Sequence, residues 1–146
     1  MRVALAQVCS TPDPQENLAL VRDYATRAAD AGARLVVFPE ATMATFARRS
    51  AEVAEPLDGP FARGVRVIAA ELGVTLVVGM FTPARSGGGA DAADAADGAD
   101  AGRRRVRNTL LVAGGVEASY DKLHLFDAWG FTESRHIEPG EDPCQI

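Results

Sequence analysis

The sequence predicts an α/β fold, and two features support this fold class. A strand pattern, a helix pattern and a second strand pattern follow one another within residues 2–38, as in a right-handed crossover between parallel strands. Further on, two strand patterns flank Gly114-Gly115, which is a strong signal for a two-residue β-hairpin turn. With 146 residues and 47% hydrophobic content, the chain is expected to form one globular domain, residues 1–146.

The chain begins with a predicted strand and a long amphipathic helix. Residues 2–9 are expected to be a strand with both faces buried, because apolar side chains occupy both alternating sets of positions. A turn cluster follows, in which Thr11 or Asp13 can cap the helix and Pro14 lies in its first turn. Apolar side chains then recur with helical spacing to about Ala31.

A second strand is predicted soon after this helix. Gly32 is the expected left-handed cap, and the apolar run at 34–38 suits a strand buried on both faces. Pro39 ends the strand because proline cannot donate to the ladder. Glu40 therefore stands at the carboxyl end of a strand, where α/β sheets gather ligands and catalytic groups.

The middle of the chain predicts another long helix and a central strand. Asp58 is the expected cap of the helix, and its apolar stripe continues until Gly73. The β-branched run at 74–81 is typical of a strand inside a sheet.

Residues 84–105 interrupt this pattern. Glycines lead into aspartates spaced three apart and then into three consecutive arginines. No Gly-Lys-Ser/Thr motif follows for phosphate, the aspartate spacing does not match a calcium loop, and the acidic residues oppose nucleic-acid binding by the arginines. Because the segment has no apolar side chains to bury, we expect a disordered hairpin extension that can be removed.

The predicted hairpin consists of strands at 106–113 and 116–126, and it delivers Lys122, which is the single lysine beside fourteen arginines. Lys122, His124 and Phe126 alternate along one predicted strand face. A compact ammonium is a good point donor to a developing oxyanion, although a half-exposed strand lysine is the simpler interpretation of this residue alone. The following residues, 128–134, are expected to form a loop.

Several motifs occur in a distinctive order along the chain. They are Val3-Ala4-Leu5-Ala6-Gln7 followed by Asn17, Val37-Phe38-Pro39-Glu40, Asn108-Thr109, the stretch from Tyr120 to Asp127, and Glu133-Ser134 followed by Pro139-Gly140. Together they resemble the nitrilase or carbon-nitrogen hydrolase superfamily, over nearly the whole chain. The resemblance implies part of a four-layer α-β-β-α sandwich made of two similar halves, of which this chain is the truncated amino-terminal half.

The resemblance also implies a chemistry and a set of site residues. The family hydrolyses non-peptide carbon-nitrogen bonds through a thioester, with Glu40 matching the base, Lys122 the oxyanion partner and Glu133 a supporting acid. The lysine motif is most similar to that of the branch containing ω-amidase and deaminated-glutathione amidase, which implies a small amide substrate. Met43 and Phe46 match a segment that lines the family's pocket, although packing under a loop is the simpler role for both.

The nucleophilic cysteine of this family is expected beyond Ile146. Cys144 lies too early for the motif, and nothing in the motif matches Cys9. The simplest role for both cysteines is that of a small apolar residue in or beside a strand. The chain as given is therefore expected to be an inactive fragment of an amidase. The alternative is a non-catalytic half-domain that binds partners or dimerises. Three retained residues of catalytic type favour the enzyme.

Composition excludes several other functions. The formal net charge of −5 argues against nucleic-acid binding, and no cysteine-histidine cluster has metal-ligand spacing, so we expect neither a metal nor another cofactor. His124 and His136 are expected to be structural. No apolar run approaches the roughly 20 residues of a membrane span, and no signal peptide is recognised, which favours a cytoplasmic protein. The family resemblance implies a homo-oligomer in the full-length form.

Overall fold

A computed structural model describes residues 1–46, 50–85 and 105–143 of the chain. The expectation for the insert at 84–105 concerns residues that, apart from 84, 85 and 105, lie outside this described part. The elements, in chain order, are β1 (Val3–Leu5), α1 (Pro14–Asp30), β2 (Leu35–Val37), α2 (Ser50–Val53), α3 (Pro60–Leu72), β3 (Thr75–Pro83), β4 (Val106–Ala113), β5 (Ala118–Asp121), β6 (Asp127–Ala128), β7 (Phe131–Thr132) and the 3-10 turn η1 (Glu133–Arg135).

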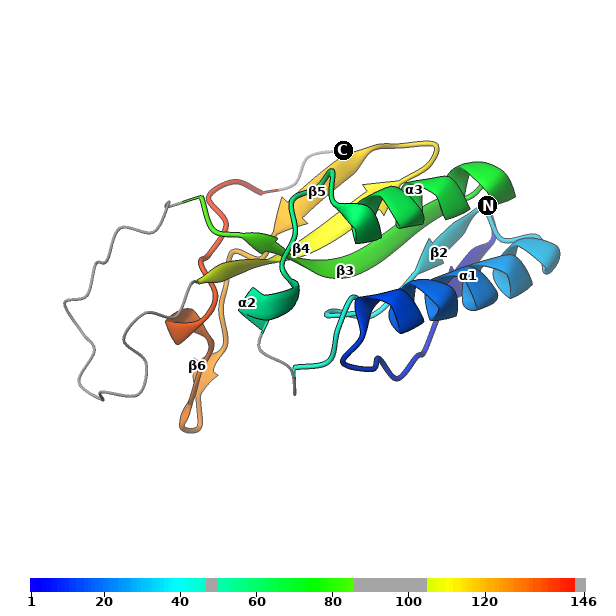
Figure 1. The fold of residues 1–146 in the computed structure, drawn as a ribbon. Helices are drawn as coiled ribbons and strands as arrows, with labels where there is room; N and C mark the ends of the chain where they lie inside the picture. Colours follow the sequence, from blue (N-terminus) through cyan, green and yellow to red (C-terminus); the bar gives the residue numbers. More distant parts are fainter. Residues whose placement is uncertain (47–49, 86–104, 144–146) are drawn as a thin grey trace.

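The described strands form one main sheet in the order β1-β2-β3-β4-β5 (Figure 1). Strands β1, β2 and β3 are parallel, whereas β4 and β5 run antiparallel to their neighbours. The predicted crossover and hairpin are therefore confirmed, and β3 lies at the centre of the sheet as its β-branched sequence predicts.

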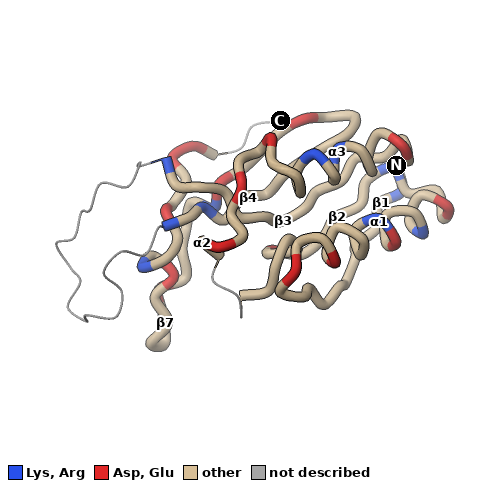
Figure 2. The backbone as a smooth tube through the Cα atoms, in the orientation of Figure 1, with Lys and Arg blue, Asp and Glu red and all other residues tan. Residues whose placement is uncertain are grey.

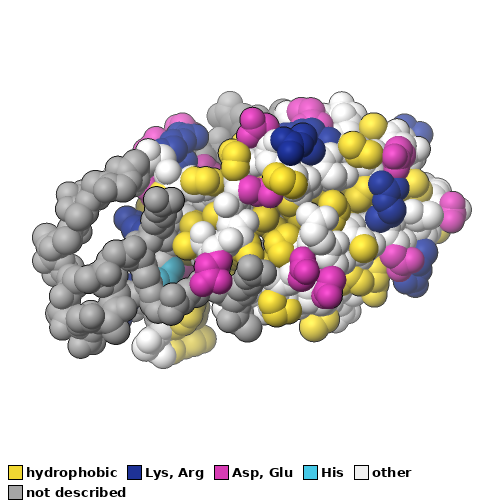
Figure 3. Space-filling view, viewed as in Figure 1, with side chains coloured by type: hydrophobic (Ala, Val, Ile, Leu, Met, Phe, Trp, Pro, Cys, Tyr) yellow, Lys and Arg dark blue, Asp and Glu magenta, His cyan; other side chains and the backbone are white. Residues whose placement is uncertain are grey.

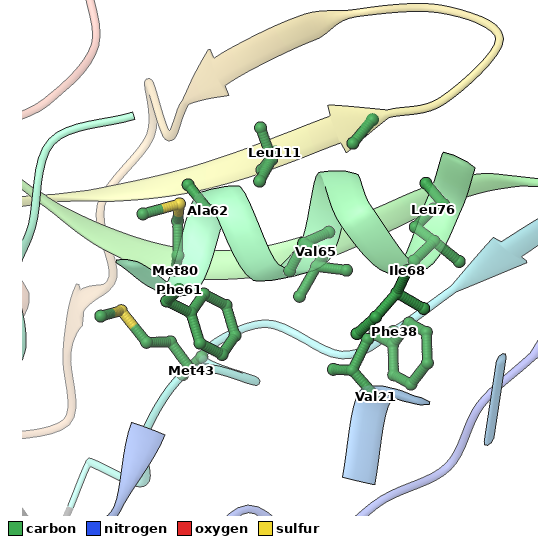
Figure 4. Packing of buried hydrophobic residues seen from close by; sticks show 14 of the residues in the cluster. Val21, Phe38, Met43, Phe61, Ala62, Val65, Ile68, Leu76, Met80 and Leu111 are labelled. Atoms are coloured by element: carbon green, nitrogen blue, oxygen red, sulfur yellow. The ribbon is translucent and has the colours of Figure 1, made fainter. Parts of the chain in front are cut away.

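Helices α1 and α3 pack side by side on one face of this sheet (Figure 1). The core lies between them and the strands, and Figure 4 shows α3 side chains directed at the strands beneath. Asp13 caps α1 by accepting a hydrogen bond from the amide of Gln15 at 2.8 Å, so one of the two predicted caps is confirmed. Figure 3 shows charged side chains interspersed with apolar ones on this helix-covered side.

The predicted cap of α3 is wrong. Gly59, not Asp58, occupies the cap position, and it makes no side-chain hydrogen bond. Instead, Glu55 Oε1 accepts from the amides of Phe61 at 2.5 Å and Ala62 at 3.1 Å. A carboxylate from the preceding turn thus satisfies the first free amides and also lies at the positive end of the helix dipole.

The second face of the sheet is open, which contradicts the prediction that the first two strands are buried on both faces. Val3 and Leu5 of β1 are 47% and 81% exposed, and Leu35 and Val37 of β2 are only half-buried. The reason is that both long helices cover the same face, where Ala4 and Val36 pack into the core. We call the side opposite the helices the open face.

The β4–β5 hairpin has a longer turn than predicted. Val112 pairs with Ala118, so the connection is not a two-residue turn at Gly114-Gly115. Gly114 has φ +123°, and a Cβ there would lie 2.3 Å from the carbonyl oxygen of Val74. Gly114 therefore allows the chain to pass close to the start of β3, and it does not form a tight hairpin turn.

Strand β5 ends at Asp121, so the predicted strand through Phe126 is wrong. The chain instead turns into a small β6–β7 ribbon, where a loop was expected, and this ribbon projects from the end of the sheet (Figure 1). Trp129 and Gly130 connect its strands, with φ values of +53° and +81°. Positive φ at both central residues is the geometry of a type I′ hairpin turn. Among the described helices, none is long and apolar enough to cross a membrane.

Candidate active site

Glu40 reaches the open face because the chain after β2 crosses over strand β3. The amide of Met43 donates to the carbonyl oxygen of Gly79 at 3.0 Å, which ties this crossing to β3. A Cβ on Gly79 would lie 2.6 Å from the nitrogen of Ala41 and 2.8 Å from the carbonyl oxygen of Pro39. Only glycine therefore lets the turn that bears Glu40 lie directly on the sheet.

The turn itself is held by local hydrogen bonds. Ala41 has φ +56°, an unusual conformation for a residue with a side chain, and the buried Thr42 donates from Oγ1 to the carbonyl oxygen of Pro39 at 2.6 Å. Asn17 of α1 is fully buried, and its Nδ2 donates to the carbonyl oxygens of Thr11 and Met43. Asn17 thus links the segment after Glu40 to the start of the first helix.

Lys122 directly follows β5, and its backbone is held on both sides. Its amide donates to the carbonyl oxygen of Asn108 at 2.9 Å, and its own carbonyl oxygen accepts from the amide of Gly140 at 2.9 Å. The first bond continues the β4–β5 ladder by one residue, which places the side chains of Asn108 and Lys122 on the same face. Phe81 of β3 pairs with Asn108 of β4, so their side chains lie on the same face. Because side chains alternate along a strand, this is also the face of Gly79, over which the turn bearing Glu40 crosses, and it is the open face.

The three charged groups predicted from the sequence meet at this point. Lys122 Nζ lies 3.2 Å from Glu40 Oε1, 3.1 Å from Glu133 Oε1 and 3.0 Å from Glu133 Oε2. The side chain of Glu133 is only 7% exposed, that of Lys122 is 29% exposed, and that of Glu40 is 50% exposed. The ammonium therefore bridges a buried carboxylate and an accessible one.

The buried carboxylate is fixed by the polypeptide around it. Glu133 begins η1, and its Oε2 also accepts from the amide of Phe126 at 2.7 Å. The β6–β7 ribbon brings Phe126 and Glu133 together, although they lie seven positions apart in sequence. The ribbon is thus the element that returns Glu133 to Lys122.

The carboxylates keep Lys122 charged. Burial lowers the pKa of Lys122, but hydrogen bonds and charges from Glu133 and Glu40 outweigh burial, so the pKa is raised above its ordinary value. The group is an ammonium at neutral pH. With one positive and two negative side chains, the cluster carries a formal net charge of −1.

Asn108 belongs to the cluster, although the sequence does not predict it as a site residue. Its Nδ2 donates to Glu40 Oε1, the same oxygen that Lys122 contacts. Within the described part of the chain, the hydrogen bonds of this carboxylate fall on Oε1 and leave Oε2 open to an incoming group. In the sequence, Asn108 is singled out only as part of the Asn108-Thr109 motif of the family. Gly79 carries a second signal, because a glycine inside a β-branched strand indicates close backbone approach.

Other residues singled out in the sequence lie elsewhere. Met43 is fully buried in the core, as the simpler interpretation predicts, whereas Phe46 is exposed and packs edge-on against Phe81. Cys9 is exposed rather than buried, and Cys144 lies outside the described residues. Among the residues that the structure describes, no three His, Cys, Asp or Glu side chains are grouped to hold a metal ion.

Comparisons with known proteins identify the family of this chain. Residues 2–146 match the family model described as carbon-nitrogen hydrolase. A hydrolase from Mycobacterium tuberculosis is 50% identical over 151 residues, covering 100% of this chain and 48% of that protein. A deaminated glutathione amidase from Mus musculus is 32% identical over 94% of this chain and 42% of its own length.

A solved structure shares the fold. An amidase from Nesterenkonia sp. AN1, in a form with the acetamide moiety of fluoroacetamide added covalently at its active-site cysteine, superposes with a TM-score of 0.68 and 30% identity. The superposition covers 98% of this chain and 49% of that one. This chain thus spans about half the length of the relatives that it matches, and the α/β layer described above corresponds to that half.

Proposed function

This chain belongs to the carbon-nitrogen hydrolase family, and we propose from that premise that Glu40, Lys122 and Glu133 form its share of an amidase active site. The observation that supports the proposal most is the contact of one ammonium with two carboxylates of unequal exposure on the open face. A surface ion pair needs only one carboxylate. General-base catalysis with a stabilised oxyanion needs an accessible carboxylate as the base and a cation that a separate group holds in place.

The proposed reaction divides among the three residues. Glu40 takes the proton from a cysteine thiol as its sulfur attacks the amide carbon, and Lys122 donates to the oxygen that becomes negative. Collapse of the tetrahedral adduct expels the amine, to which Glu40 returns the proton, and leaves a thioester. Glu40 then activates a water that hydrolyses the thioester. Glu133 holds the ammonium in place throughout.

The accessible oxygen of Glu40 and the buried position of Glu133 suit these different roles. Both contacts that Glu40 makes with other described side chains are to Oε1, which leaves Oε2 for proton transfer. Both oxygens of Glu133 contact Lys122, and Oε2 also accepts from a backbone amide, so this carboxylate is committed to holding the cation. We therefore assign the base to Glu40 rather than to Glu133.

The cysteine and the cover of the site are proposed to come from residues beyond these 146. The open face bears exposed apolar side chains beside the cluster, and a second sheet packed there would dry the site and bring in the thiol. We further propose small non-peptide amides as substrates, by analogy with the deaminated glutathione amidases among its relatives. A cytoplasmic location and a homo-oligomeric full-length form are part of the same proposal.

The test is an assay of small ω-amides with two preparations. The 146-residue chain alone should release no ammonia above background, because the proposed nucleophilic cysteine lies beyond these 146 residues. Adding the carboxyl-terminal half of the Mycobacterium tuberculosis hydrolase as a second polypeptide should produce activity that thiol reagents abolish. Turnover by the chain alone that disappears in Cys144→Ala would overturn the assignment and make Cys144 the nucleophile.

A further inference from the structure

We propose that Arg107 is a positioning residue, which clamps together the two chain segments from which Lys122 and Glu133 extend into the site. Arg107 precedes Asn108 on β4, so its side chain leaves the strand on the helix side while Asn108 points to the open face. The inference rests on the proposed function for the roles of Lys122 and Glu133, but its test does not depend on activity.

The contacts of Arg107 are those of a buried clamp. Its side chain is 3% exposed. Its Nη1 lies 2.8 Å from Asp121 Oδ2, and its Nε and Nη2 lie 2.8 Å and 2.5 Å from Glu138 Oε1. Burial lowers the pKa of Arg107, but the pairs with Glu138 and Asp121 outweigh burial and raise it, so the guanidinium stays charged. The planar fork of arginine can hold two carboxylates at fixed positions, which a lysine cannot do.

The two carboxylates belong to the segments that bear the site. Asp121 immediately precedes Lys122, and Glu138 lies five residues after Glu133. Figure 2 shows basic and acidic stretches gathered at this end of the sheet, where the β6–β7 ribbon projects.

The segment that contains Glu138 takes the place of β5 beside β4. Val106 and Ile137 form a parallel bridge, and the amide of Glu138 donates to the carbonyl oxygen of Val106 at 2.7 Å. Gly140 packs so closely that a Cβ on it would lie 2.3 Å from the carbonyl oxygen of Asp121. Both segments therefore meet directly beneath Lys122, and Arg107 joins their side chains at that junction.

Loss of Arg107 would let the two segments that meet at this junction move apart. Asp121 and Glu138 are 19% and 12% exposed, and removal of the guanidinium that lies between these two largely buried carboxylates strengthens their mutual repulsion. Thr109 supports the same junction without charge, because its Oγ1 donates to Asp121 Oδ1 at 2.7 Å. Movement of either segment would lengthen the contacts of Lys122 with Glu40 or Glu133.

The direction in which the pKa of Lys122 shifts distinguishes a positioning role of Arg107 from other roles. Removing a nearby cation raises the pKa of an ammonium by simple electrostatics. Loss of a cation that only stabilises the fold therefore leaves that pKa unchanged or raises it in a folded variant. Displacing Lys122 from its carboxylates lowers the pKa, because Glu40 and Glu133 are the groups that raise it.

The experiment uses the single lysine of the 146-residue chain as its probe. Protein labelled with 13C at lysine Cε gives one side-chain signal, whose pH titration reports Lys122. The variants are Arg107→Gln, the uncharged Thr109→Val, and the control Arg22→Gln, which breaks an exposed ion pair between α1 and α3.

Arg107→Gln is expected to lower the pKa of Lys122 toward its ordinary value of about 10.4, and Thr109→Val to shift it the same way by less. Arg22→Gln should leave it unchanged. An unchanged or raised pKa in folded Arg107→Gln overturns the proposal. If that variant does not fold, Thr109→Val decides: a lowered pKa supports the clamp, and an unchanged pKa overturns it. Failure of the amide assay alone would count against the proposed function and not against this inference.

Discussion

At the scale of single residues, Lys122 links the charge of the site to the stability of the chain. Its raised pKa means that the folded state binds this proton more tightly than the unfolded state does. The resulting stabilisation is fully present below the unfolded pKa of about 10.4 and is lost as the pH rises through the higher folded pKa.

This linkage gives a first prediction for the variant Lys122→Met. Between pH 7 and 9, the free energy of unfolding of the variant should lie below that of the unsubstituted chain by a constant amount. Above about pH 10.5 the difference should shrink, because the lysine of the unsubstituted chain then loses its proton. Urea unfolding at several pH values measures this. A difference that stays constant to about pH 11.5, roughly one unit above the unfolded pKa, would show that the ammonium is not what the carboxylates stabilise.

Gly79 gives a second prediction. In Gly79→Ala, the new methyl group would overlap the backbone of the turn that bears Glu40, so the turn must move away from β3. We expect a loss of roughly 1–3 kcal/mol in the free energy of unfolding and a lowered pKa of Lys122, because one carboxylate leaves it.

A matched control for Gly79 is Gly73→Ala. Gly73 has φ +64°, but a Cβ added there would have no neighbouring atom within 4 Å, so this change strains the helix end without touching the site. It should lower stability while leaving the pKa of Lys122 unchanged. Equal effects of both variants on that pKa would contradict the role given to Gly79.

At the scale of elements, the sequence predicts the helices better than the strand ends. Helix α1 has a cap, a stripe and a terminal glycine that are all local signals, and each is confirmed. The end of β5 depends on contacts that are distant in sequence, because residues 136–138 replace it beside β4. The alternation from Lys122 to Phe126 therefore suggests a strand that tertiary contacts do not allow.

The start of α3 gives an element-scale prediction. Glu55→Ala should lower the free energy of unfolding by about 1 kcal/mol, because two amides at the helix start lose their acceptor. Asp58→Ala is the control, since the sequence favours Asp58 as the cap but the structure shows Glu55 in that role. Thermal unfolding monitored by circular dichroism compares them, and a larger loss in Asp58→Ala would make Asp58 the cap after all.

At the scale of the whole molecule, the open face joins the fold to the proposed function. The cluster of Glu40, Lys122 and Glu133 lies on the same side of the sheet as the exposed residues of β1. A single layer of strands with helices on one side exposes an apolar surface, and β1 is also an edge among the described strands. Such surfaces promote association.

This exposure predicts that the 146-residue chain associates with itself through the open face. Leu5→Lys should reduce the association, because it places a charge at the most exposed apolar position of β1. Val67→Lys, on the outer surface of α3, is the control, since Val67 is also an exposed apolar residue but lies on the helix side. Sedimentation at several concentrations measures both, and equal effects would place the association elsewhere.

The candidate site is predictable where it depends on residue type and order. Glu40 follows a proline-terminated strand, Lys122 is the single lysine, and Glu133 fits a motif, so the sequence alone singles out all three. The bonds of Asn108 and the crossing over Gly79 require the register of four strands, which no local pattern specifies. The expectation of a strand buried on both faces fails because burial depends on what packs against each face.

The most direct test of the central claim is the rate of ammonia release by a single-chain chimera. Residues 1–146 are joined to the part of the Mycobacterium tuberculosis hydrolase that follows its matching region, and kcat is measured with a small ω-amide. Lys122→Met should lower kcat by about 100-fold or more, as expected when a donor to a developing oxyanion is lost, while Arg22→Gln stays within about twofold. A chimera that is active and keeps its kcat in Lys122→Met would contradict the account.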